Sequence, residues 1–408
     1  MNTKKTSLSL AVALLAVCGA TQAQTSPVRP SYAFPSAPSG DRGPAAVQVG
    51  TSPVFVSPWA SAAFGNDSNL NLSRDNEIDS AYQVYGAGVM ADARDAKSVF
   101  QLSLMASHGR YSDSKADNYT DSQARASYDI AFTPRNFLRA SWDYMRGHDP
   151  RGSTDRGISG SPDKYYVSTP GVMYSYGAPS AQGRMEVWAS QAARRYRNNR
   201  DFTVGSDRDT QDYGGAFYWR VQPKTQLILE ARRAELDYKL DTSTLSGDET
   251  RYLVGVTWDA TAATSGTVKA GRLEKRFDSG RPTFKGTSWE GMVTWLPRSY
   301  SKFDFYSSRS TNESTGLGNF ILTDASGVVW THGWNSLFST AANARIQKDK
   351  YKGFDRDDDI TSFGLKANYK FRRWLTLGAE YQYTNRDSNI QINEYDKNLW
   401  LISAVLSM

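Results

Sequence analysis

Apolar and polar residues alternate one by one through most of the chain from residue 54 onward. In one segment, Leu375, Leu377, Ala379, Tyr381 and Tyr383 are separated by Thr376, Gly378, Glu380, Gln382 and Thr384. Successive side chains of a β-strand point to opposite faces, so a period of two predicts a strand with one apolar and one polar face. Residues 363–372, 124–132 and 138–144 repeat the pattern. The sequence therefore predicts an all-β fold.

The length of the alternating segments favours a membrane protein. They run for about 10 to 15 residues, whereas strands of soluble sheets usually have 5 or 6. Aromatic residues make up 12% of the chain and collect toward the segment ends, as they do at the two interfaces of a membrane-spanning barrel. A soluble β-sandwich or propeller would also alternate, but it explains neither feature. We therefore predict a transmembrane antiparallel up-and-down β-barrel.

The connections between the segments alternate in length. Residues 133–136, 222–224 and 297–299 form tight turns, whereas 147–163, 197–208 and 311–327 are long polar links. Short turns on the periplasmic side and long loops outside are typical of outer-membrane barrels. The predicted strands number eighteen, at 54–64, 81–91, 97–110, 120–133, 135–147, 163–176, 182–196, 209–222, 224–239, 248–260, 264–277, 283–297, 299–311, 328–339, 340–351, 358–371, 373–387 and 393–406. An even number places both termini in the periplasm; sixteen is the alternative, because 328–339 and 340–351 are weakly patterned.

One segment departs from strict alternation. Its apolar face passes from Leu227, Leu229 and Ala231 to Ala234, Leu236 and Tyr238 across Arg232-Arg233. An extra residue in one strand would produce this shift. The pattern predicts a β-bulge at these two arginines.

The N-terminus has the features of an export signal. Lys4 and Lys5 precede the apolar run 8–17, and Thr21-Gln22-Ala23 resembles a cleavage site. Residues 24–53 are rich in Pro, Ser, Gly and Ala, a composition typical of a flexible segment. The predicted organisation is a signal peptide at 1–23, a flexible Pro-rich periplasmic segment at 24–53 and an outer-membrane barrel at 54–408. Cys18, the only cysteine, falls within the predicted signal peptide, so the mature chain would have none.

The polar faces of the strands are expected to line the lumen, because charge on the lipid face costs ~2–4 kcal/mol at the bilayer midplane. They carry both signs of charge, at Arg125, Asp129, Arg139, Asp143, Glu186, Glu290, Lys302, Asp304, Lys366, Lys370, Arg372 and Glu380. A barrel of this size encloses an aqueous interior.

The three histidines are far apart and no nucleophile motif is present, so we expect neither an enzyme nor a metal or other cofactor. The net charge of +6 is spread along the chain, which argues against nucleic acid as a partner.

Three stretches resemble a known family. They are Gly65-Asn66-Asp67-Ser68-Asn69-Leu70, the run from Arg194-Arg195-Tyr196-Arg197-Asn198-Asn199 to Asp207-Arg208-Asp209, and Phe371-Arg372-Arg373-Trp374-Leu375-Thr376-Leu377-Gly378 with Tyr381, Tyr383, Arg386 and Asp387. In order and spacing they resemble the putative β-barrel porin type 2 family, especially its EpsL-like branch encoded with exopolysaccharide operons. Ser68 departs from the family's more usual Asp. The resemblance implies an outer-membrane barrel that takes part in exopolysaccharide biosynthesis or export, without catalytic residues.

Two functions remain open besides exopolysaccharide export: a general porin-like channel for small solutes, constricted by an inward-folded 147–163 loop, and a structural barrel. The hypothesis for a glycan path through the lumen names Arg194, Arg195, Lys366, Lys370, Arg372 and Glu380; the alternative is that these charges pair within the wall.

Expected partners are outer-membrane lipids and lipopolysaccharide, polysaccharide and export-complex proteins. The barrel assembly machinery is a further expected partner, because the alternating apolar residues Trp400, Ile402, Ala404, Leu406 and Met408 resemble its C-terminal signal.

Overall fold

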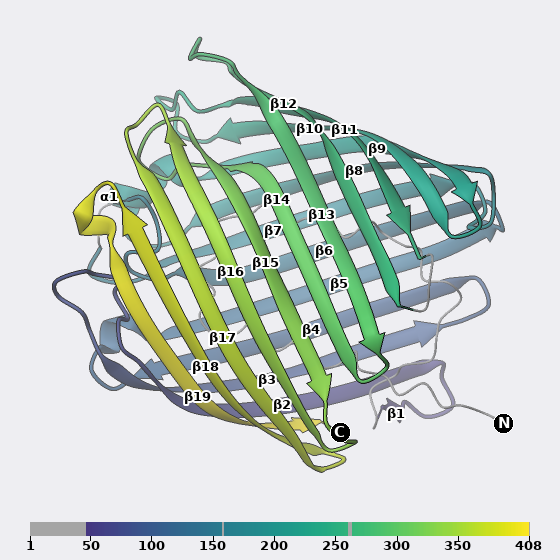
Figure 1. Cartoon of the computed structure of the whole chain (residues 1–408), viewed down its shortest axis with the longest axis horizontal. Coiled ribbons are helices and arrows are strands. Elements are labelled where there is room, and N and C mark those ends of the chain that lie inside the picture. The colour runs from purple at the N-terminus through teal and green to yellow at the C-terminus, as the bar shows by residue number, and fades with distance from the viewer. Residues whose placement is uncertain (1–45, 157–158, 260–262, 408) are drawn as a thin grey trace.

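The chain folds into one closed β-barrel (Figure 1). The structure, a computed structural model, describes residues 46–156, 159–259 and 263–407. Each strand from β2 to β19 pairs antiparallel with the next along the chain, and β19 closes the ring by pairing with β2. The prediction of an antiparallel up-and-down barrel of eighteen strands is confirmed. No helix in the described ranges is both long and apolar enough to cross a bilayer.

The strands are β2 (Val54–Asp67), β3 (Ser80–Arg94), β4 (Ser98–Tyr111), β5 (Tyr119–Thr133), β6 (Asn136–Asp149), β7 (Asp163–Tyr176), β8 (Gly183–Tyr196), β9 (Arg208–Gln222), β10 (Thr225–Tyr238), β11 (Gly247–Trp258), β12 (Thr264–Phe277), β13 (Phe284–Arg298), β14 (Ser301–Asn312), β15 (Phe320–Gly333), β16 (Phe338–Lys352), β17 (Asp357–Arg372), β18 (Leu375–Ser388) and β19 (Tyr395–Ser407). Short helices α1 (Arg200–Thr203), η2 (Lys115–Asp117), η3 (Val204–Ser206) and η4 (Gln391–Asn393) lie in the connections. We name the end with the short connections the turn end and the other the loop end.

The predicted signal peptide lies outside the described residues, as does most of the predicted Pro-rich segment. The last part of that segment, residues 46–53, contains the short strand β1 (Val47–Gln48). Val47 pairs with Val56 and Gln48 with Phe55. β1 therefore extends the sheet beside the first residues of β2, beyond the point where β19 ends against Trp59.

The two faces of the barrel wall have opposite chemistry, as the alternation predicts. Large apolar side chains are exposed on the outside, including Leu229, Val254 and Ile402 at 57%, 58% and 60%. Charged side chains such as Lys269 and Glu290 are buried on the inside. This inversion of the soluble arrangement suits a wall with lipid outside and polar groups within. Outward aromatics gather near both ends, with Trp295 and Trp330 beside Phe303 at the turn end and Phe64 against Trp400 toward the loop end.

Two sequence predictions need correction. The predicted strand 328–339 is observed as β15 at Phe320–Gly333. The long link predicted at 311–327 is therefore only the loop 313–319. The sequence at 320–327 was misread because Asp324 and Ser326 face outward there, at the polar loop end. Asp324 is held by Arg309, with which it pairs across the two strands.

The predicted bulge at Arg232-Arg233 is wrong. β10 keeps one register with β9 and β11 through both arginines, and its register shift lies at Thr225/Gln226. The apolar face changes because the surroundings of the strand change along its length, from the lipid-exposed middle to the loop end. Leu227 and Leu229 face lipid, whereas Leu236 and Tyr238 point inward at the loop end, where they are buried.

Candidate functional site

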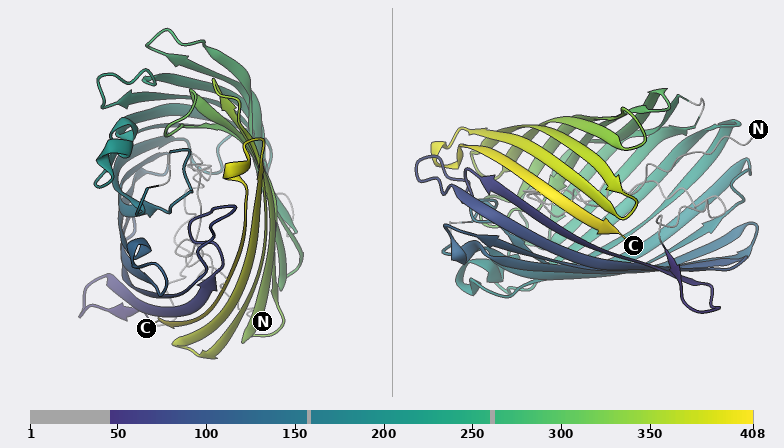
Figure 2. Two further views of the ribbon diagram at one scale, coloured as in Figure 1. Left: turned by 90° about the vertical axis from the view of Figure 1, so that its left-hand side faces the viewer. Right: turned by 90° about the horizontal axis from the view of Figure 1, so that it is seen from below.

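Segments of the chain enter the lumen at the loop end. They are the connections 68–79, 150–162 (without 157–158) and 313–319, and Figure 2 (left) shows the first two inside the ring of strands. Their side chains are buried although they belong to loops: Asn69, Leu72, Arg156 and Ser314 are each less than a tenth exposed. We call these segments the inward loops. The porin hypothesis predicted that 147–163 would fold inward, and the structure places its residues 150–156 there.

The Asp155 carboxylate joins two inward loops that are far apart in sequence. Its Oδ1 accepts the backbone N–H of Thr315 at 2.8 Å, and its Oδ2 accepts those of Leu317 at 3.0 Å and Gly316 at 3.2 Å. The Thr315 hydroxyl also donates to it. Burial raises the pKa of this carboxyl, although the N–H donors of Leu317 and Thr315 act in the opposite direction. We call this contact the Asp155 latch.

Arg156 anchors the same loop to the wall. Its guanidinium donates to Asp163 at 2.7 Å, to Asp149 at 3.3 Å and to the Ser206 hydroxyl at 3.0 Å. It also stacks 4.6 Å from the centre of the Tyr196 ring. Contacts to three strands and a neighbouring connection fix the root of the loop, because a planar guanidinium can bind several acceptors at once and stack on a ring.

The inward loop 68–79 packs against the 150–156 segment. Gly152 has a φ of +72°, and a side chain there would collide with the Asn71 carbonyl and Leu72. Arg151, the residue before Gly152, donates to Asp117 Oδ1 at 2.8 Å, and Asp117 lies in the connection between β4 and β5. The loop end is therefore closed by segments that hold one another, rather than by one loop alone.

Below the inward loops, ion pairs line the lumen wall. Lys269 contacts Glu230 at 2.8 Å, and Arg232 contacts Glu290 at 2.6 Å. These four residues come from β10, β12 and β13 and are mostly buried, so the attraction within the pairs offsets the cost of removing the charges from water. Similar pairs join Arg139 to Asp129 and Lys302 to Asp304.

The side chains of the described residues do not fill the whole interior. Arg125 on β5 points inward and pairs with Asp143, yet its side chain is 60% exposed. The inward-facing Met90 and Met292 are 48% and 52% exposed. Their exposure shows open space in the part of the lumen nearer the turn end.

The six residues predicted for a glycan path occupy different environments. Lys366 on β17 and Glu380 on β18 face inward and pair with each other at 3.4 Å. Lys370 and Arg372 lie further along β17 at the turn end and are exposed, with Arg372 against the Phe371 ring. The structure brings Lys366 and Lys370 to one strip of the inner wall. Beyond the register shift that follows Lys370, Arg372 pairs with Leu375 of the outward face, and Arg194 and Arg195 lie on another strand.

Arg194 and Arg195 are neighbours on β8 and therefore point to opposite faces. Arg194 faces the lumen at the loop end, where it lies 3.7 Å from the centre of the Tyr165 ring and 3.3 Å from Asp149. Arg195 faces outward and contacts Asp209 at 2.7 Å. The prediction that both line the lumen is wrong for Arg195, because a strand cannot direct adjacent side chains to one face.

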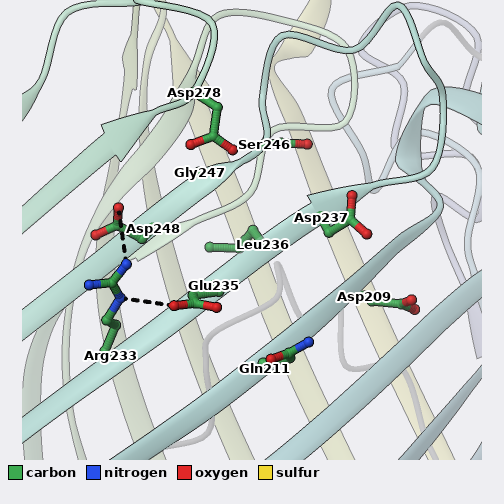
Figure 3. A pocket seen from close by; sticks show the side chains of 10 residues that line it. All are labelled: Asp209, Gln211, Arg233, Glu235, Leu236, Asp237, Ser246, Gly247, Asp248 and Asp278. Atoms are coloured by element: carbon green, nitrogen blue, oxygen red, sulfur yellow. Dashed lines mark ion pairs between the residues drawn. The ribbon is translucent and has the colours of Figure 1, made fainter.

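Arg195 belongs to an outward charged surface at the loop end of β8 to β12. Figure 3 shows part of this surface, a shallow pocket beside β9, β10 and β11. Arg233 there lies 3.1 Å from Glu235 and 3.7 Å from Asp248, and Lys239 contacts Asp209 at 2.8 Å. Charges on the outer face mark the level at which these strands leave the hydrocarbon, since they would be costly within it.

Sequence reasoning missed the Asp155 latch and its partner loop 313–319. The long link 147–163 was a visible signal, but nothing in the sequence pairs Asp155 with backbone groups 160 residues away. The described residues contain no group of three or more His, Cys, Asp or Glu side chains that could hold a metal ion.

Comparisons with known proteins agree with the architecture. Solved structures with similar folds include OccK2 (OpdF) of Pseudomonas aeruginosa, crystallised with glucuronate, at 10% identity and a TM-score of 0.51 over 87% of this chain and 98% of that one. A BenF-like porin from Pseudomonas fluorescens Pf-5 has 8% identity and a TM-score of 0.50 over 87% and 99%. No curated protein matches the chain. Residues 43–407 match the family described as putative beta-barrel porin 2. The chain therefore belongs to this family and is a porin-like β-barrel of the outer membrane.

Proposed function

We propose that this barrel is a passive, non-enzymatic channel for small hydrophilic solutes, closed at its loop end by the inward loops. The Asp155 latch is the observation that carries the proposal, because it holds two loops across a lumen that has open space below them. The latch consists of hydrogen bonds between loops. It can therefore open without disturbing the hydrogen-bonded ladder of the wall.

The proposal includes an orientation. The loop end faces outside and the turn end faces the periplasm, because short turns lie on the periplasmic side in barrels of this type. Both termini then lie in the periplasm. The outward charged surface around Arg195 and Arg233 would meet lipopolysaccharide, and the C-terminal strand β19 would be recognised by the barrel assembly machinery.

Planar-bilayer recording of the purified protein tests the channel. Asp155→Ala leaves three backbone N–H groups without their acceptor, which costs roughly 1–3 kcal/mol for a buried group. We expect the open-to-closed ratio to rise about tenfold, since 1.4 kcal/mol corresponds to tenfold. The control is Asp241→Ala in the exposed 239–246 connection, which should behave like wild type. If neither wild type nor Asp155→Ala conducts, the channel proposal is wrong.

Exopolysaccharide export is the second candidate. Its support is the resemblance to EpsL-like proteins and the position of Lys370, an inward cation at the turn end without an ion-pair partner among the described residues. This candidate predicts that combined Lys366→Ala and Lys370→Ala lowers secreted polysaccharide while the barrel stays folded and heat-modifiable. Normal secretion from that variant, together with solute conductance, would leave the small-solute channel as the function.

A further inference from the structure

Arg345 differs from the paired cations of the lumen wall. It lies at the middle of β16 and points inward, since its neighbour Ile346 is exposed on the lipid face. Its guanidinium donates to the Gln347 amide oxygen, and its Nε is buried without a hydrogen-bond partner. No carboxylate in the described part of the chain forms an ion pair with it. Arg125, Arg139, Arg232 and Lys269, which also face the lumen, each have one.

Two glycines leave room for further donors beside Arg345. Gly327 on β15 pairs directly with Arg345, and the Tyr306 hydroxyl from β14 lies over it, where a side chain on Gly327 would collide. Gly364 on β17 pairs with Asn343, whose amide lies over that glycine in the same way. Within the described ranges, neither Tyr306 nor Asn343 has a side-chain hydrogen bond. We call Tyr306, Asn343 and Arg345 the Arg345 site.

Carboxylates on β16 and on the nearby strand β18 already have other partners. Glu380 pairs with Lys366. Asp349, further along β16, accepts from Gln347 at 2.7 Å and from Thr323 at 2.6 Å, so each of its oxygens accepts a hydrogen bond from another residue. Gln347 thus stands between Arg345 and Asp349. The Arg345 site keeps a positive charge and several free donors at mid-depth, below the inward loops.

We propose that the Arg345 site binds the oxyanion of a small solute, a carboxylate or a phosphate, as that solute passes through the lumen. A guanidinium fork binds either group through two parallel hydrogen bonds, and the Tyr306 hydroxyl and the Asn343 amide supply neighbouring donors. This inference rests on the channel function proposed above and assigns its substrate class: small hydrophilic anions in preference to neutral solutes.

Current block in planar bilayers tests the site with gluconate, inorganic phosphate and sorbitol. Sorbitol has the same polyol chain as gluconate without the carboxylate. We expect Arg345→Gln to weaken block by gluconate, by phosphate or by both about tenfold, the effect of losing one charge-assisted hydrogen bond. Sorbitol should act equally on both proteins. Weakened gluconate block identifies a carboxylate ligand, and weakened phosphate block identifies a phosphate ligand.

Two further variants separate the site from general lumen charge. Arg125→Gln removes the same charge from an inward residue that is paired with Asp143, and it should change gluconate and phosphate block less than about twofold. Arg345→Lys keeps the charge but loses the planar guanidinium that binds an oxyanion through two hydrogen bonds. The strength of anion block in this variant should therefore lie between the values for wild type and Arg345→Gln. Heat-modifiable migration confirms that each variant is folded.

The outcomes distinguish the two proposals. If no protein conducts, including Asp155→Ala, the channel function itself is wrong. If the channels conduct but Arg345→Gln and Arg125→Gln change the block of both anions equally, the Arg345 site is overturned and the channel function stands.

Discussion

At the scale of single residues, the Asp155 latch shows how one carboxylate can hold a loop that has no regular structure. Both oxygens accept backbone N–H groups of consecutive residues, Thr315, Gly316 and Leu317. Such an arrangement satisfies amides that would otherwise be buried without partners. It also places a titratable group at the point where two inward loops meet.

The latch should therefore respond to pH. Docking buries the Asp155 carboxyl, and this burial raises its pKa from the ordinary value of 3.8. The docked form takes up a proton at a higher pH than the undocked form, so acidification favours docking and rising pH disfavours it. We expect the open probability of wild type, recorded in bilayers, to increase as the pH rises above about 4, the ordinary pKa of an Asp carboxyl.

The matched variant is Asp155→Asn, whose amide does not titrate across this range. Its open probability should change less with pH than that of wild type. Equal pH profiles for the two proteins would show that Asp155 is not the source of the pH dependence.

At the scale of strands, the alternation makes a sharp prediction about β5. Ala126 and Ser127 are small neighbours at the middle of this strand, with Ala126 facing lipid and Ser127 facing the lumen beside Arg125. Ala126→Arg places a charge at the bilayer midplane, at a cost of ~2–4 kcal/mol, whereas Ser127→Arg places it in water. Outer-membrane yield of heat-modifiable protein should fall for the first and stay near wild type for the second. Equal yields would refute the assigned faces.

Strands were the most predictable part of this molecule, because lipid outside and polar groups inside impose the period of two on each of them. β17, for example, was predicted at 358–371 and is observed at Asp357–Arg372. The prediction failed where that contrast weakens. On β10, Leu236 and Tyr238 are apolar yet face inward at the loop end, so a face change looked like a bulge. On β15, the outward Asp324 breaks the apolar pattern, so the first residues of the strand were not recognised.

The candidate site was less predictable than the strands, since it depends on contacts between distant segments. The inward course of the loop after β6 agrees with the porin hypothesis, which proposed that 147–163 constricts the lumen. The contact of Asp155 with residues 315–317 could not be, because backbone amides carry no sequence signal. The opposite faces of Arg194 and Arg195 could have been predicted from the alternation, but both residues were assigned to the lumen. Whether a lumen charge is paired depends on cross-strand register, which the sequence does not give. Lys366 lies opposite Glu380 and pairs with it, whereas Arg345 lies between Gly327 and Ser362.

At the scale of the whole molecule, the orientation can be tested with single cysteines, since the sequence contains only Cys18, within the predicted signal peptide. Thr242 lies exposed in the connection between β10 and β11 at the loop end, and Arg135 lies exposed in the turn between β5 and β6. A membrane-impermeant maleimide should label Thr242→Cys in intact cells and leave Arg135→Cys unlabelled until the cells are lysed. The reverse result would invert the proposed topology.

The Asp155 latch also has a consequence for how sequences of this kind can diverge. Its acceptor is a side chain, but most of its donors are main-chain groups that every residue except proline possesses. Residue 317 can therefore change to any residue except proline without losing the contact. A side chain at Gly316 would lie 3.3 Å from the Asp155 carbonyl oxygen, and position 155 itself cannot change. Among relatives with the same closure, we expect an acidic residue to persist at 155 opposite a loop whose side chains vary and from which proline is missing.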